Sequence, residues 1–279
     1  MNRAKFFAAL RPRASGVFGG SLTQPQVQGT EAIIDEGHRR GLSVRHLAAV
    51  LAEAYHETGG KMQPVTENLT YSTAARIRAV WPSRFPSVAS AEPFVRNPQK
   101  LANKVYGGRL GNIGADDGWR FRGRGLAQIT GRENYRKFDL EAFPEQALDL
   151  AVSVHILIEG MLKGIFTGKK LSDYDTLNGY NYRGSRAIIN ADVSANGEDI
   201  ERYAVAFENA LLAAEYDPKA KTAPAPVTTS TASPKPPVPS NKPAATGTAV
   251  AAGGIVAALA AGATFLSTKA CDWFGLFCG

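Results

Sequence analysis

The composition of the chain changes abruptly after Asp217, and this change limits which part can fold around a core. Eight of the sixteen prolines lie within residues 218–243, mixed with alanine, threonine, serine and lysine. Such a segment buries too little apolar surface to offset the entropy of ordering it. We therefore expect a folded domain over residues 1–217, followed by a disordered linker over residues 218–243.

The segment after the linker predicts a membrane helix. Residues 244–268 carry no charge, and this length exceeds the roughly 20 residues that cross a bilayer core. Gly254, Ala258 and Gly262 recur every four residues, which suits close helix packing, and aromatic residues in the tail 269–279 resemble an interfacial anchor. We expect a single C-terminal transmembrane helix in the inner membrane. Ten alanines between residues 243 and 268 leave a flexible tail as the alternative.

The positive charge of the chain indicates an anionic partner. The formal net charge is +7, and residues 76–136 alone hold 12 Lys and Arg against 4 Asp and Glu. Nucleic acid, acidic lipid and an acidic polymer are all negatively charged and could bind such a basic region. A solvated basic face with no ligand is the alternative interpretation.

Cysteine and histidine usage argues against a metal site. Cys271 and Cys278 both lie in the last nine residues, where they could form a small disulfide loop, and the chain has four histidines. The short apolar patch near the N-terminus is interrupted by Arg11, so we expect no cleavable export signal and folding in a reducing cytosol. We expect neither a metal nor a cofactor.

Residues 1–217 have the apolar spacing of helices. Ser43 is a candidate N-cap for a helix with Leu47, Leu51 and Tyr55 on one face, ended by glycines at positions 59 and 60. Residues 145–162 and 198–216 show similar spacing, whereas residues 61–143 show no clear period. The pattern predicts a mainly α domain with long loops and little β-sheet.

Two glutamates are candidates for acid–base chemistry. Glu57 stands where the predicted helix meets the glycine loop, a position that combines partial desolvation with access to a cleft. A zinc-protease motif is excluded because Gly60 occupies the place of its second histidine. Glu67 follows ten residues later, and the pair could oppose each other across a groove, as an inverting glycosidase requires. Taken alone, either glutamate could be a solvated surface residue.

An arginine-rich and glycine-rich block covers residues 117–135. Arginines alternate with aromatic residues before Gly123 and Gly125, and Gln128 stands where a dinucleotide loop has its third glycine. A nucleic-acid-binding strand is also compatible with this alternation.

Several separated motifs, in the same order, resemble the family 19 glycoside hydrolases, which are chitinase-like. These motifs are residues 18–20, 22–24, 57–60, 67–72, 106–109 and 118–135. The closer likeness is to the bacteriophage-type endolysins, and it covers roughly residues 15–215. The resemblance implies a lysozyme-like α-helical catalytic domain that needs no cofactor.

The resemblance also implies a role for each matching residue. Glu57 corresponds to the general acid and Glu67 to the general base, while Thr130 helps to hold the attacking water. Substrate binding is assigned to Gln128, Asn134 and Asn190, and support of the acidic pair to Arg202. The chain departs from the family at Ala191 and Asp192, where many members have two glycines, and at Glu133, a position that is often aromatic.

Together these patterns predict an endolysin that hydrolyses the β-1,4 bonds of peptidoglycan during host cell lysis. Peptidoglycan carries free carboxylates on its peptide stems and chitin is neutral, so the basic block favours the cell wall as partner. We expect a monomer, made in the host cytoplasm or at the inner membrane and acting on the wall in the periplasm, with no nucleic-acid partner. A chitinase, and a non-catalytic wall-binding or nucleic-acid-binding module, are the alternatives.

Overall fold

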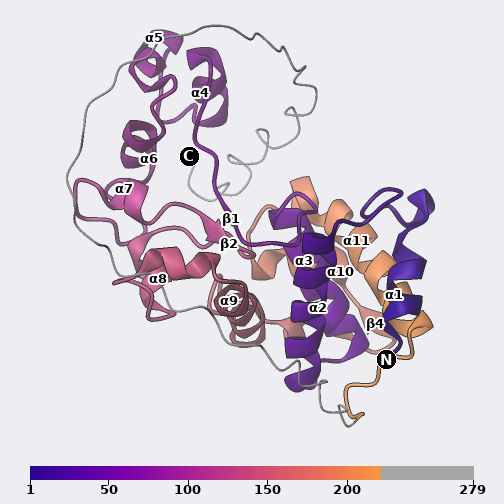
Figure 1. Ribbon diagram of the computed structural model, residues 1–279. Helices are drawn as coiled ribbons and strands as arrows, with labels where there is room; N and C mark the ends of the chain where they lie inside the picture. Colours follow the sequence, from indigo (N-terminus) through magenta and orange to yellow (C-terminus); the bar gives the residue numbers. More distant parts are fainter. Residues whose placement is uncertain (221–279) are drawn as a thin grey trace, which may run out of the picture. The chain divides into compact units, whose positions relative to one another are not determined.

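The computed structural model describes residues 1–220, which are mainly helical (Figure 1). Within this range the α-helices are α1 (Arg3–Leu10), α2 (Gln24–Arg39), α3 (Val44–Glu57), α4 (Ala74–Val80), α5 (Val88–Ala91), α6 (Pro98–Tyr106), α7 (Asp117–Arg120), α8 (Arg132–Arg136), α9 (Leu150–Lys163), α10 (Tyr182–Ser185) and α11 (Val193–Ala213). Two antiparallel strand pairs join them: β1 (Val65–Thr66) with β2 (Arg124–Gly125), and β3 (Asp175–Thr176) with β4 (Gly179–Tyr180). The result is consistent with a lysozyme-like α fold.

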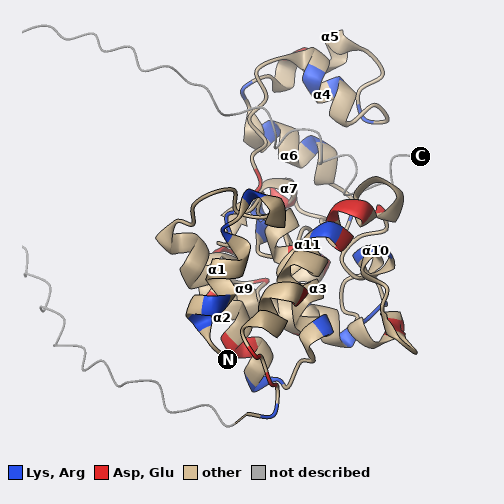
Figure 2. Ribbon diagram, turned by 90° about the vertical axis from the view of Figure 1, so that its right-hand side faces the viewer, with Lys and Arg blue, Asp and Glu red and all other residues tan. Residues whose placement is uncertain are grey.

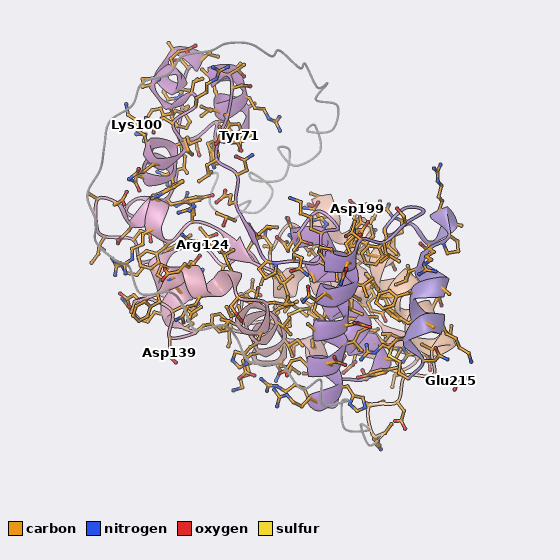
Figure 3. All side chains as sticks on the ribbon, in the orientation of Figure 1. Tyr71, Lys100, Arg124, Asp139, Asp199 and Glu215 are labelled. Carbon is orange, nitrogen blue, oxygen red and sulfur yellow. The ribbon has the colours of Figure 1, made fainter. Side chains whose placement is uncertain are left out.

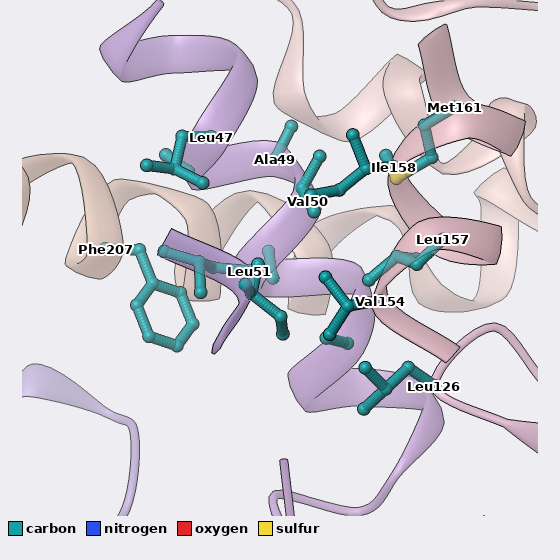
Figure 4. Close-up of a cluster of buried hydrophobic side chains, with 14 of the residues drawn as sticks. Leu47, Ala49, Val50, Leu51, Leu126, Val154, Leu157, Ile158, Met161 and Phe207 are labelled. Carbon is teal, nitrogen blue, oxygen red and sulfur yellow. The ribbon is translucent and has the colours of Figure 1, made fainter. Parts of the chain in front are cut away.

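The main hydrophobic core surrounds α3, in what we call the larger lobe (residues 1–66 and 121–217). Leu47 and Leu51 of α3 are fully buried, as are Leu157 of α9 and Phe207 of α11 (Figure 4). Each such side chain contributes roughly 1.5–3 kcal/mol relative to an exposed one. Because α3 packs against α11, α9 and α2, its C-terminal end is held firmly.

Both ends of α3 agree with the sequence prediction. The Ser43 hydroxyl accepts a hydrogen bond from the His46 amide at 3.2 Å, as an N-cap does. Gly59 and Gly60 have φ angles of 59° and 78°, in the left-handed region that ends a helix at little cost for glycine. Glu57 is therefore the last residue of the helix.

A second hydrophobic core lies in the smaller lobe (residues 69–120), a region in which the sequence shows no clear apolar period. Ile77, Trp81, Leu101 and Val105 are buried together with eight other apolar residues. The helices of this lobe have four to nine residues, too few for an apolar period to stand out.

The other two predicted helices exist with shifted starts. Residues 144–148 form a 3₁₀ turn, and α9 begins after Asp149, whose carboxylate accepts from the Val152 amide at 3.1 Å. The last helix, α11, begins at Val193, five residues before the predicted start.

The structure does not test the C-terminal predictions. Most of the predicted linker (218–243), the predicted membrane helix (244–268) and the two-cysteine tail (269–279) lie outside the described residues. Within residues 1–220, no helix is long and apolar enough to span a membrane.

The strands β1 and β2 lie between the two lobes (Figure 1). Val65 pairs with Gly125 and Thr66 with Arg124, and the Glu67 amide donates to the Gly123 carbonyl at 2.9 Å. Glu67 thereby follows directly from an anchored strand.

Candidate active site

A cavity of about 220 Å³ brings both predicted glutamates together. Its lining comes from the end of α3, from β1 and the residues after it, from the loop after β2, and from the start of α11. The lining residues are His56, Glu57, Thr58, Lys61, Val65, Thr66, Glu67, Asn68, Tyr71, Gln128, Arg186, Asp192 and Asn196. Figure 3 labels Tyr71, on the smaller lobe, and Asp199, which follows Asn196 by three residues on α11.

Glu57 is held by an arginine that the sequence analysis did not assign. The Arg186 side chain is 2% exposed, and its Nη1 donates to Glu57 Oε1 at 2.6 Å. The Glu57 side chain is only 6% exposed, although it faces the cavity. A short, charge-assisted hydrogen bond of this kind fixes the carboxyl in one orientation.

Arg186 organises two further carboxyls. Its Nη1 also donates to Glu53 Oε2 at 2.6 Å, and its Nε and Nη2 donate to the two oxygens of Asp192 at 2.6 and 3.2 Å. Asn196 Nδ2 donates to Asp192 Oδ2 at 2.6 Å. Burial by itself lowers the pKa of Arg186, but the surrounding carboxylates outweigh it and raise that pKa well above its ordinary value.

Glu67 has a different environment. The Tyr106 hydroxyl donates to its Oε1 at 2.5 Å, and the Gly123 amide donates to its Oε2 at 3.3 Å. Burial raises the pKa of Glu67, and these two donors together with the charge of Arg122 oppose the rise. Both donors favour the ionised form, so this carboxylate is arranged to accept a proton.

Gln128 reaches the cavity from a turn whose backbone is unusual. Its φ is 48°, a left-handed value for a residue other than glycine, and its Nε2 donates to the carbonyls of Val65 at 2.7 Å and Gly125 at 2.8 Å. The side-chain amide therefore bridges β1 and β2, and Gln128 forms part of the cavity wall.

Two other predicted site residues, Thr130 and Asn134, contact the turn that carries Gln128 and do not line the cavity. The buried Thr130 hydroxyl donates to the Gln128 carbonyl at 3.1 Å, and Asn134 Nδ2 donates to the Thr130 carbonyl at 2.8 Å. In the described part of the chain neither residue lines the cavity; both support the turn that carries Gln128.

Asn190 and Arg202 have settings that differ from each other. Asn190 is buried, and its Oδ1 accepts from the Ala191 amide at 2.8 Å. Arg202 is 56% exposed, pairs with Asp199 at 2.8 Å, and lies over the Tyr203 ring. Arg202 was predicted to support the acidic pair, and the arginine that the structure places beside Glu57 is Arg186.

Three residues that shape the site were missed or left without a role, and each gave a faint signal. Glu53 is the single acidic residue in an otherwise apolar stretch of α3, one turn before Glu57. Arg186 precedes three apolar residues close to Asn190. Tyr106 belongs to a motif that the sequence analysis recognised without assigning its function.

Glu53, Glu57 and Asp192 are arranged about Arg186, which donates to each of them. Among the residues that the structure describes, no group of three or more His, Cys, Asp or Glu side chains is positioned to hold a metal ion.

Comparison with known proteins supports the family suggested by the motifs. No family model matches the chain. A curated protein of Haemophilus influenzae (strain ATCC 51907 / DSM 11121 / KW20 / Rd), named "Glycosyl hydrolase family 19 domain-containing protein", is 39% identical to it over 120 residues. The match covers 39% of this chain and 58% of that protein. Over the matched residues the chain is therefore similar to a protein named for glycosyl hydrolase family 19, and it spans about 58% of that protein's length.

Proposed function

We propose that the chain hydrolyses the β-1,4 glycosidic bonds of bacterial peptidoglycan by an inverting general acid/general base mechanism. The observation that carries this proposal is that Glu57 and Glu67 line one cavity in opposite hydrogen-bonding environments. Two carboxyls in distinct settings are what acid and base roles require.

In this mechanism Glu57 acts as the acid and Glu67 as the base. The bond between the anomeric carbon and the glycosidic oxygen breaks while Glu57 transfers its proton to that oxygen. Water attacks the anomeric carbon from the opposite face, and Glu67 accepts the proton that the water loses. The two products together contain the atoms of one water molecule. Proton exchange with solvent then protonates Glu57 and ionises Glu67 again.

The hydrogen bonds at Glu67 suit the base. A general base must be ionised before water attacks, and the Tyr106 hydroxyl and the Gly123 amide both stabilise the charged form. Since burial still raises its pKa, Glu67 is a better proton acceptor than a solvated glutamate.

The charge of the smaller lobe favours an anionic glycan. Arg78 on α4, Lys100 and Lys104 on α6, and Arg96 between them are exposed and form no ion pair within residues 1–220. In Figure 2 the charged positions on α4 and α6 are blue, among tan residues. Peptide-stem carboxylates of the wall complement this surface, whereas neutral chitin does not. Hydrolysis of sacculi should therefore weaken with added salt more than hydrolysis of chitin oligomers.

The biological role that fits this chemistry is that of an endolysin. The proline-rich linker and the uncharged segment 244–268 would hold a monomeric enzyme at the inner membrane until lysis, after which it acts on the wall in the periplasm. Fractionation of cells that express the intact chain tests the anchor, because a wholly soluble product contradicts it.

The two glutamates give the direct test of the proposed chemistry. Glu57→Gln and Glu67→Gln should each nearly abolish the turbidity loss of permeabilised Gram-negative cells, while far-ultraviolet circular dichroism and the melting temperature stay near those of the unmodified chain. Glu201→Gln, at an exposed position of α11, is the matched control and should keep full activity. An active Glu57→Gln protein contradicts the proposal.

Product analysis separates the two candidate substrates. Mass spectrometry of muropeptides released from purified sacculi should find reducing ends, and chitin oligomers should be cut more slowly. Faster cleavage of chitin oligomers would make the chain a chitinase, the activity to which its resemblance also points.

A further inference from the structure

Lys61 lines the cavity, and the mechanism above gives it no part. It is exposed, and within residues 1–220 its ammonium group forms no ion pair. The other basic residues of the lining are His56, which is 9% exposed, and Arg186, whose side chain is 2% exposed and donates to carboxyls of the protein. Among the described residues of the lining, Lys61 is therefore the lysine or arginine whose charge is left for a ligand.

The backbone on both sides of Lys61 is held in place, so the side chain starts from a fixed point. Gln26 Nε2 on α2 donates to the Gly60 carbonyl at 2.8 Å, and the Met62 amide donates to the Thr58 hydroxyl at 3.0 Å. Met62 is fully buried with a φ of 53°, a left-handed value that a residue other than glycine keeps only where its surroundings enforce it. The chain is thus anchored immediately before and after an exposed lysine.

Most of the other charged side chains in the cavity wall are carboxyls. Glu57, Glu67 and Asp192 all line it, and Arg186 already donates to Glu57 and Asp192. A carboxylate of a ligand that came close to one of these acids would be repelled. The lysine ammonium carries three donors on a flexible four-carbon stem, so it can follow and bind a carboxylate that enters on its side of the cavity.

We propose that Lys61 is a substrate-binding residue that pairs with a peptide-stem carboxylate of the glycan bound in the cavity. This inference rests on the proposed hydrolysis of peptidoglycan and adds to it the group that distinguishes a stem-bearing glycan from a neutral one. Chitin has no carboxylate and offers Lys61 no such partner. The pairing acts within the cavity itself, whereas the basic residues of the smaller lobe attract the polymer from outside it.

The test combines one change in the protein with one change in the substrate. Lys61→Gln removes the charge of the lysine, and treatment of sacculi with a carbodiimide and ammonia converts their carboxyls to amides. On native sacculi we expect Lys61→Gln to raise the apparent KM about three- to tenfold with little change in kcat. On amidated sacculi the same substitution should change KM by less than about twofold, because the partner of the lysine is already gone.

Comparing the proteins on the same substrate isolates the contribution of Lys61. Amidation also weakens attraction to the smaller lobe, but it does so for every protein alike. Lys61→Arg keeps the charge and should stay close to the unmodified chain on native sacculi. Lys169→Gln is the matched control, since Lys169 is exposed, forms no ion pair within residues 1–220 and does not line the cavity; it should leave KM in place on both substrates.

The outcomes separate this inference from the proposed function. If Lys61→Gln raises KM by the same factor on native and amidated sacculi, or raises it on neither, the pairing is refuted, while hydrolysis of sacculi that is lost in Glu57→Gln leaves the proposed function standing. If the unmodified chain does not cut sacculi, the proposed function itself fails and the pairing fails with it.

Discussion

Replacing Tyr106 with phenylalanine tests how the hydrogen bonds at Glu67 prepare it for its proposed role as the base. The Tyr106 hydroxyl donates to Glu67 Oε1 at 2.5 Å, and Tyr106 itself is 2% exposed. Tyr106→Phe keeps the ring and removes the hydrogen bond that the hydroxyl donates to the Glu67 carboxylate. Such bonds contribute about 1.5–3 kcal/mol, and one pKa unit corresponds to about 1.4 kcal/mol. The pKa of Glu67 should therefore rise by a further 1–2 units or so.

The sign of the expected effect on activity follows from the proposed role of Glu67 as the base. Glu67 must be ionised to accept a proton, so activity falls as the pH drops through its pKa. Tyr106→Phe should move this acidic limb of kcat/KM to higher pH by about 1–2 units, with a loss of roughly tenfold or more on the limb and a much smaller loss on the alkaline side. Initial rates of sacculus hydrolysis between pH 4 and 9 measure both limbs.

Stability gives an independent check on the same bond. Below the unfolded pKa of about 4.5, Glu67 is protonated in both the folded and the unfolded state, and Tyr106→Phe removes only a neutral hydrogen bond of about 1 kcal/mol. Above the folded pKa the carboxylate loses a charge-assisted bond. The destabilisation in urea titrations should therefore be larger at pH 8 than at pH 4.

The matched control is Tyr216→Phe, which removes a buried hydroxyl that donates to the Leu42 carbonyl at 3.0 Å. It should cost about 1 kcal/mol at either pH and leave the acidic limb in place. A folded Tyr106→Phe protein whose acidic limb coincides with that of the unmodified chain would refute the account of Glu67 given above.

Two further changes test the scaffold of the site. Arg186→Lys keeps a positive charge but cannot bind Asp192 through two nitrogens while reaching the glutamates, so it should cost about 3–5 kcal/mol in urea unfolding and most of the activity. Gly29→Ala places a Cβ 1.6 Å from the Met62 carbonyl oxygen, so it should destabilise the fold by at least about 1–3 kcal/mol, whereas Gly20→Ala, with nothing within 4 Å, should be close to neutral in the same titration.

The helix that carries Glu57 was predictable because its signals are local. The Ser43 cap, the apolar stripe through Leu47 and Leu51, and the glycines at its end all lie within 18 residues of sequence. The cap marks the start of the helix, the glycines mark its end, and the apolar stripe marks the face that packs against the neighbouring helices.

The smaller lobe could not be predicted in the same way. Its helices begin at caps such as Thr73, Ser87 and Asn97, but they end within three turns, so no window of sequence shows a period. Its core exists because Leu69 and Tyr71 pack against residues about 30 positions later, on α6. Contacts of that range leave no mark on a local pattern.

The identity of the arginine beside Glu57 also depends on distant contacts. Arg186 and Arg202 stand on either side of Asn190, and the apolar residues that follow Arg186 are only a faint sign that it is the buried ion-pair partner. The difference lies in packing: the Arg186 side chain is 2% exposed among three carboxyls, and the Arg202 side chain, in the middle of α11, is 56% exposed. Matching motifs by their order along the sequence cannot show which of the two arginines is buried.

The nine residues between the two glutamates look like a free loop in the sequence, yet the larger lobe holds them at several points. Gln26 Nε2 on α2 donates to the Gly60 carbonyl at 2.8 Å, the Thr58 hydroxyl accepts from the Met62 amide at 3.0 Å, and Gln128 Nε2 donates to the Val65 carbonyl at 2.7 Å.

Every one of these bonds is made by the protein itself, so the spacing of Glu57 and Glu67 is set before a substrate arrives. Preorganised groups need little rearrangement at the moment of reaction, which is where much of the rate enhancement of enzymes originates. The tethers come from three separate elements, α2, the end of α3 and the turn after β2. Loosening any one of them should therefore lower the turnover rate, even though none of these side chains needs to exchange a proton with the sugar.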